Sequence, residues 1–202
     1  MNICVFASGS GSNFKAIIEA KRSGFLSSEI CLLISNNSAC GAVEVAKQYG
    51  IDVFHISRHV YKDIEGDEYS GLFISKLKDY KIDLIMLAGY MKKIDSRVIQ
   101  EYDRRIINIH PAILPSFGGA GMYGMNVHKA VINSGVKVTG LTIHFVDANY
   151  DEGEIILQKF INVHADDNAV SLQKRVLSLE HKYYSKVLKE IETGKIKIGK
   201  NF

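Results

Sequence analysis

The chain has 202 residues, of which 47% are hydrophobic and 23% are charged, and its formal net charge is +3. This length and apolar content suffice for one domain with a full hydrophobic core, and they exclude a disordered chain. The small net charge is untypical of proteins that bind nucleic acid through a strong basic field, so no nucleic-acid partner is expected.

The cysteines and the apolar runs bear on the cellular compartment. Cys4, Cys31 and Cys40 have neither metal-binding nor redox spacing, which is typical of reduced core thiols. The first strand-like segment begins at Ile3 with no basic region before it, and the longest apolar run, around residues 84–88, is far too short to span a bilayer. We therefore expect a cytoplasmic protein with no membrane partner.

Short apolar segments alternate with amphipathic ones over the first 110 residues. The apolar segments are typical of strands, several of them covered on both faces, and comprise residues 3–7, 30–34, 53–56, 84–88 and 106–110. Helical spacing occurs between them, at residues 12–22, 41–49, 67–80 and 95–102. This βαβ series predicts an α/β fold with a doubly wound, mostly parallel sheet.

After Pro111 the regular alternation of apolar and amphipathic segments ends. The expected elements are a glycine-rich loop at 116–126, a short helix near 127–133, β-rich segments at 138–146 and 154–163, and a final helix at about 168–192. Because no repeat or linker divides the chain, we expect a single domain spanning 1–202, in which the last strands form an antiparallel C-terminal extension of the sheet.

The motif Ser8-Gly9-Ser10-Gly11-Ser12-Asn13 lies between the first strand and the first helix. Glycines at this point let backbone amides approach an anion at a helix N-terminus, which suits a phosphate monoester. Phe14 replaces the third glycine of a dinucleotide fingerprint, and the second strand ends without an acidic ribose ligand, so NAD is not expected. The alternative is a glycine turn in which Ser12 or Asn13 caps the helix.

The motif Asn108-Ile109-His110-Pro111 ends the fifth strand. Residues two apart in a strand face the same side, so Asn108 and His110 can point into one crevice at the ligand-binding edge of the sheet. An amide donor beside a titratable histidine suits acyl transfer to an amine, because one group can hold an oxyanion and the other can move protons. A structural role for His110 is the alternative.

His144 and Asp151 lie on and just beyond the sixth strand. A carboxylate from this loop could orient His110 and raise its pKa by favouring the imidazolium. A hydrated acidic turn is the alternative. His55 and His59 have i, i+4 spacing but follow a strand and lack the glutamate of a zinc helix, so no metal is expected.

Taken together, these motifs resemble the phosphoribosylglycinamide formyltransferase family, folate-dependent enzymes of purine synthesis, over nearly the whole chain. The residues that carry the resemblance are Ser8 to Asn13, Leu87-Ala88-Gly89-Tyr90-Met91, Asn108 to Pro115, His144-Phe145-Val146 with Asp151, and Ile155-Ile156-Leu157-Gln158. The chain departs from the family pattern at Lys92 and Gly66, where arginines are usual, and at Ala120.

The resemblance implies a Rossmann-like formyltransferase fold and a role for each motif. Catalysis would fall to Asn108, at the formyl oxygen, to His110 as general acid, and to Asp151, which would raise the pKa of His110. Gly11, Ser12 and Asn13 would hold the phosphate of the ribonucleotide, with Glu180 at its ribose. Met91, Lys92, Lys93, Ile94 and Asn108 would line the folate site.

The implied reaction moves the formyl group of 10-formyltetrahydrofolate, a co-substrate, to the amine of 5'-phosphoribosylglycinamide, without a metal. The partners would be these small molecules, and the protein would be a monomer or a homodimer. The segment 1–110 would be the phosphate-binding half, and 111–202 the folate-binding and catalytic-loop half. Alternatives are another formyl transferase, a formyltetrahydrofolate hydrolase, or a non-catalytic phosphosugar-binding module.

Overall fold

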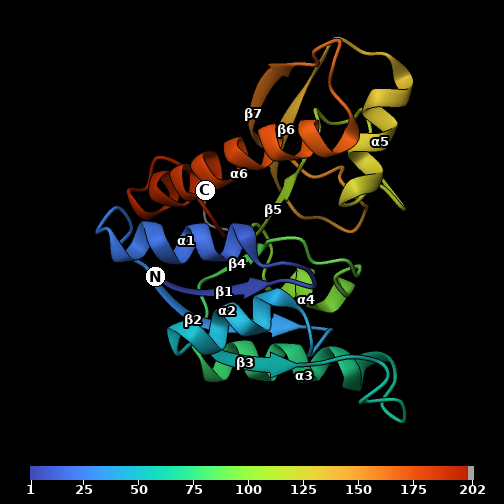
Figure 1. Ribbon diagram of the computed structural model, residues 1–202. Helices are drawn as coiled ribbons and strands as arrows, with labels where there is room; N and C mark the ends of the chain where they lie inside the picture. The colour runs from blue at the N-terminus through green and yellow to red at the C-terminus, as the bar shows by residue number, and fades with distance from the viewer. Residues whose placement is uncertain (200–202) are drawn as a thin grey trace.

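The computed structural model describes residues 1–199, so residues 200–202, the end of the predicted domain, lie outside the described part (Figure 1). One seven-stranded sheet has the order β3-β2-β1-β4-β5-β6-β7. Its strands are β1 (Asn2–Phe6), β2 (Glu29–Ser35), β3 (Asp52–His55), β4 (Leu84–Leu87), β5 (Ile106–His110), β6 (Val138–Phe145) and β7 (Ile155–Asn162). The helices are α1 (Ser12–Arg22), α2 (Gly41–Tyr49), α3 (Gly66–Asp79), α4 (Ser96–Glu101), α5 (Met125–Ser134) and α6 (Ala169–Glu192).

The pairing of the strands confirms the predicted fold class. Strands β1 to β5 are parallel, whereas β6 pairs antiparallel with both β5 and β7. The alternation of apolar and amphipathic segments thus gave the right elements, and the β-rich segments after Pro111 form the antiparallel extension. Strand β1 lies between β2 and β4, so the order of the strands reverses beside it. At such a switch point, the loops that follow neighbouring strands diverge and open a crevice for a ligand.

Two apolar layers explain why the central strands are hydrophobic on both faces. In β1, Ile3 to Phe6 are all 0% exposed. Ile3 and Val5 pack with residues of α1, α2 and α6, whereas Cys4 and Phe6 pack with residues of α3 and α4. Each buried aliphatic side chain contributes about 1.5–3 kcal/mol relative to an exposed one, so this layering stabilises the sheet from both sides.

Helix α6 packs against α1, α5, β6 and β7 (Figure 1). It begins at Asn168 with a capping box, and Leu172, Val176 and Val187 are buried on the face that meets the core. The buried Tyr184 hydroxyl lies 2.9 Å from the Leu87 carbonyl oxygen and 3.1 Å from that of Ile107. The helix is therefore fixed to the carboxyl end of β4 and to β5. None of the helices within residues 1–199 is both long and apolar enough to cross a membrane.

Candidate active site

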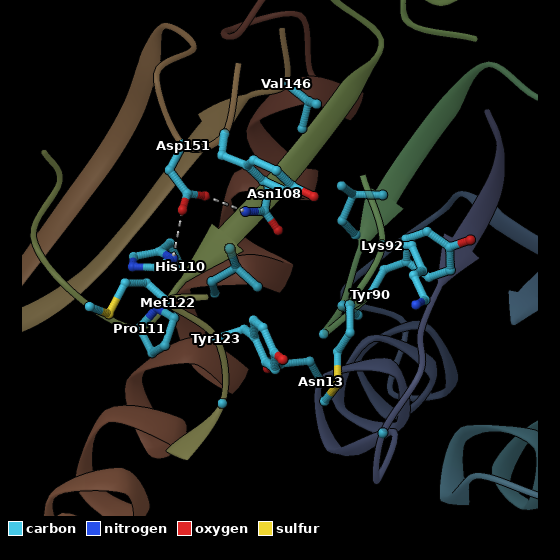
Figure 2. Close-up of a pocket in the computed structure, with 18 of the residues that line it drawn as sticks. Asn13, Tyr90, Lys92, Asn108, His110, Pro111, Met122, Tyr123, Val146 and Asp151 are labelled. Carbon is cyan, nitrogen blue, oxygen red and sulfur yellow. Dashed lines mark hydrogen bonds and ion pairs between the residues drawn. The ribbon is translucent and has the colours of Figure 1, made fainter. Parts of the chain in front are cut away.

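A cavity of about 370 Å3 lies at the carboxyl ends of β1, β4 and β5. Figure 2 shows Asn108, His110 and Asp151 on one side of it, with Asn13, Tyr90 and Lys92 on the other. The glycine-rich loop contributes residues 119–124 to the lining. All the residues that the sequence singled out for the site therefore line one cavity, namely Gly11, Ser12, Asn13, Met91, Lys92, Lys93, Ile94, Asn108, His110, Asp151 and Glu180.

The start of α1 leaves backbone amides open to this cavity. Gly11 is the N-cap in a left-handed conformation, with φ of 77°, and no side chain caps the helix. The alternative in which Ser12 or Asn13 caps the helix is therefore wrong. A Cβ on Gly11 would lie 2.6 Å from the Cα of Ala42, so only glycine fits both the conformation and the close packing on α2. Uncapped amides at a helix N-terminus attract phosphate.

Asn13 connects this helix start to α6. Its Nδ2 donates to Oε2 of Glu180 over 2.6 Å, whereas its buried Oδ1 has no partner among residues 1–199. Burial raises the pKa of Glu180, and the hydrogen bond from Asn13 offsets part of this effect. A buried carboxylate that faces a cavity beside an unpaired amide oxygen can accept hydrogen bonds from the hydroxyls of a ligand.

The segment after β4 forms the opposite wall. The Ser8 hydroxyl accepts a hydrogen bond from the Met91 backbone amide over 3.0 Å and donates to Oδ1 of Asn36 over 2.5 Å. Ser8 thus holds the loops after β1, β2 and β4 in register. Ile94 is buried and Met91 is 46% exposed, so this wall offers apolar surface and backbone groups to a ligand.

Asn108 faces His144 and Asp151. Its Nδ2 lies 3.2 Å from Nε2 of His144 and 3.5 Å from Oδ1 of Asp151. Nδ1 of His144 donates to the Phe145 carbonyl oxygen over 2.7 Å, and its Nε2 lies 3.6 Å from Oδ1 of Asp151. The 3.5 Å distance from Asn108 Nδ2 to Asp151 is at the long limit for a hydrogen bond. An oxygen atom of a bound ligand can therefore accept this amide hydrogen instead.

His110 is 3% exposed and is held on two sides. Its Nε2 donates to the Phe117 carbonyl oxygen over 2.8 Å, and its Nδ1 lies 3.6 Å from Oδ2 of Asp151. Because a carbonyl can only accept, the neutral ring carries its proton on Nε2 and leaves Nδ1 as a lone pair. His110 therefore has a free basic nitrogen beside the carboxylate.

Asp151 is positioned by backbone strain and by hydrogen bonds. It has φ of 59°, an uncommon left-handed conformation for a non-glycine residue. Its Oδ2 accepts from the Gly119 amide over 2.9 Å, which links it to the glycine-rich loop. Burial tends to raise the pKa of Asp151, but the neighbouring histidines and the Gly119 amide outweigh burial and hold this pKa below its usual value. Asp151 is thus an anion at neutral pH.

Asp151 raises the pKa of His110, as expected, but the net shift of this pKa is downward. Burial lowers the pKa of His110, and it outweighs the negative charge of Asp151 and the hydrogen bond to Phe117, which both raise it. The sequence could place a carboxylate beside the histidine, but it could not show that the ring is almost fully removed from water. In the free protein, His110 is therefore mostly neutral at pH 7, and a proton has to reach it during the reaction.

His128 is a cavity residue that the sequence reasoning missed. It lies on α5, is 3% exposed, and its Nδ1 has no hydrogen-bonding partner in the described part of the chain. Burial lowers the pKa of His128 to about 4, and nearby His110 adds to this effect. The sequence did contain a signal for this burial, because His128 lies between Val127 and Val131 on the apolar face of the helix expected at 127–133.

This depressed pKa predicts a loss of stability in acid. Above pH 6.5 the His128 ring is neutral in both states, whereas between pH 6.5 and 4 only the unfolded chain takes up the proton. The free energy of unfolding should therefore fall by about 3 kcal/mol more in the wild-type protein than in His128→Leu over that range. Urea unfolding at a series of pH values measures the difference, and parallel curves for the two proteins would contradict the prediction.

Known proteins resemble this chain in sequence and in structure. The formyl transferase family model matches residues 1–188. The chloroplastic phosphoribosylglycinamide formyltransferase of Vigna unguiculata is 42% identical over 94% of this chain and 60% of its own length. That of Bacillus subtilis (strain 168) is 36% identical over 93% of this chain and 92% of its own length. The crystal structure of glycinamide ribonucleotide transformylase 1 from Symbiobacterium toebii, 33% identical, has a TM-score of 0.89 and covers 98% of this chain and 91% of its own.

These matches cover most of this chain, but different shares of the relatives. The chain spans 60–66% of the length of two plant relatives and nearly all of the Bacillus subtilis protein. The family match covers the elements that build the cavity, from β1 to most of α6. The chain therefore belongs to the formyl transferase family.

Proposed function

We propose that the protein transfers the formyl group of 10-formyltetrahydrofolate to the amine of 5'-phosphoribosylglycinamide, in purine nucleotide synthesis. One observation carries the proposal: the uncapped start of α1 and the Asn108, His110 and Asp151 cluster face the same cavity. A phosphorylated amine bound at the helix would present its amine to a formyl group beside the cluster.

Different walls of the cavity bind different parts of the two substrates. Gly11, Ser12 and Asn13 bind the phosphate, and Glu180 accepts from the ribose hydroxyls. The folate lies against the segment from Met91 to Ile94. Because residues of both 1–110 and 111–199 line the cavity, the proposed site needs both halves, and their separate assignment to phosphate and folate stays a prediction.

The chemistry requires that one C–N bond forms and another breaks. The amine attacks the formyl carbon, and Asn108 Nδ2 donates to the oxygen as it becomes negative. Neutral His110 takes the proton that the amine releases, and its imidazolium is stabilised by Asp151 and by the oxyanion. The same proton then passes to the folate nitrogen as this nitrogen leaves, so that no covalent enzyme intermediate is needed.

Absorbance-monitored deformylation of 10-formyltetrahydrofolate, with and without 5'-phosphoribosylglycinamide, tests this proposal. Folate product that forms only with the acceptor supports transfer to this amine. Product that forms equally well without the acceptor would instead indicate a formyltetrahydrofolate hydrolase. No product in either reaction would contradict both activities and favour a non-catalytic phosphosugar-binding module. The oligomeric state, monomer or homodimer, stays a prediction that sedimentation would decide.

A further inference from the structure

Two side chains that line the cavity each keep a buried polar atom without a hydrogen-bonding partner. Within residues 1–199, six side chains have such an atom, and of these only Asn13 and His128 belong to the cavity. An unpaired polar atom in a protein interior lowers stability, because it gives up its hydrogen bonds to water. Asn13 already has a part in the proposed function, whereas His128 has none.

The packing of α5 fixes the ring of His128 at the cavity. Val127 and Val131, on either side of it along the helix, are both 0% exposed. Val131 packs with Leu172 and Val176 of α6. The ring cannot turn out to solvent unless α5 separates from α6, so His128 is held at the cavity before a ligand arrives.

The two ring nitrogens of His128 differ in their access to the cavity. Nδ1 is fully buried, whereas Nε2 is not enclosed in this way and has no hydrogen-bonding partner within residues 1–199. Because His128 lines the cavity, Nε2 is the nitrogen that is open to it. A buried N–H without an acceptor is less favourable than a buried lone pair, so the neutral ring carries its proton on Nε2. His128 therefore presents an N–H donor to the cavity.

This donor lies beside the proposed reaction centre. His110 and His128 are close enough for a charge on His110 to lower the pKa of His128. In the proposed function, His110 meets the amine of the acceptor, and a single methylene separates this amine from the carbonyl group of the glycinamide. A donor next to His110 can reach that carbonyl oxygen while the phosphate stays at the start of α1. A carbonyl oxygen only accepts hydrogen bonds, so it matches an N–H group.

We propose that Nε2 of His128 donates a hydrogen bond to the carbonyl oxygen of the glycinamide group and so holds the acceptor amine beside His110. This inference rests on the proposed function, since it concerns the same acceptor. His128 would recognise the glycinamide part of the acceptor, whereas α1 and Glu180 bind its phosphate and ribose. The contact requires no proton transfer by His128, which stays neutral.

Calorimetric titration of the full chain with two ligands tests this contact. The ligands are 5'-phosphoribosylglycinamide and ribose 5-phosphate, which lacks the glycinamide group. His128→Leu should weaken the binding of 5'-phosphoribosylglycinamide about tenfold, because one hydrogen bond is lost and the carbonyl oxygen is left unpaired. The affinity for ribose 5-phosphate should not change. His128→Gln should restore part of the lost affinity, because its amide can place an N–H donor near the position of Nε2.

Two further measurements separate binding from folding. His128→Leu should be at least as resistant to urea as the wild-type protein at neutral pH, because the substitution removes an unpaired buried nitrogen. His181 is the matched control, since it lies on α6 with its own buried Nε2 unpaired within residues 1–199, but it does not line the cavity. His181→Leu should therefore leave both affinities unchanged.

The possible outcomes distinguish this contact from the proposed function. The contact is refuted, and the proposed function stands, if His128→Leu binds 5'-phosphoribosylglycinamide as tightly as the wild-type protein does. Equal losses of affinity for both ligands, or a clear loss of stability, would show a structural role for His128 and would also refute the contact. A wild-type protein that binds 5'-phosphoribosylglycinamide no more tightly than ribose 5-phosphate would contradict both the contact and the proposed acceptor.

Discussion

His110→Ala is expected to lower kcat for formyl transfer by about 10²–10⁴-fold, the usual contribution of a positioned proton-transfer group. The variant should keep its fold, because the ring contacts one carbonyl and one carboxylate at the end of β5 and does not join the two apolar layers. Steady-state kinetics at saturating substrates, with circular dichroism as a check on folding, measure the effect.

Substitution of Asp151 tests whether Asp151 and His110 act in the same proton-transfer step. Asp151→Asn should itself slow turnover and should lower the pKa of His110 further, since the Asp151 charge raises that pKa. The double variant should then be little slower than His110→Ala alone, because both changes remove the same proton-transfer step. His164→Ala, an exposed histidine outside the cavity, serves as a control. Near-normal turnover of His110→Ala would refute the assignment.

Gly11→Ala is expected to raise KM for the phosphorylated acceptor about 10–100-fold, as expected for the loss of a charge-assisted contact to phosphate. An alanine at φ of 77° costs about 1–2 kcal/mol, and its Cβ would lie 2.6 Å from the Ala42 backbone, so the loop has to move away from α2. KM for the acceptor should rise far more than KM for the folate.

Gly50→Ala is the matched control for this loop. Gly50 has a similar φ of 68° at the end of α2, but an added Cβ would meet no atom within 4 Å. The variant should therefore show the same kind of backbone strain in thermal unfolding, with both KM values unchanged. Equal kinetic effects of the two substitutions would mean that strain alone, rather than a phosphate-binding role for Gly11, explains the loss.

Much of the fold could be predicted because its causes are local in sequence. The run from Ile3 to Ala7 indicates a strand buried on both faces, and the apolar spacing after Asn168 indicates a long helix with one buried side. The two-residue period of a strand likewise placed Asn108 and His110 on one side of β5. These inferences needed no knowledge of distant contacts.

The sequence by itself determined the order of strands and helices, the glycine at the start of α1, and the set of polar residues at the ends of the strands. Only the tertiary structure decided how those residues behave chemically. The sign of the His110 pKa shift depends on burial as well as on Asp151, and burial is set by segments far apart in the chain. The lack of a partner for Nδ1 of His128 within residues 1–199 likewise results from packing between elements, which local pattern does not encode.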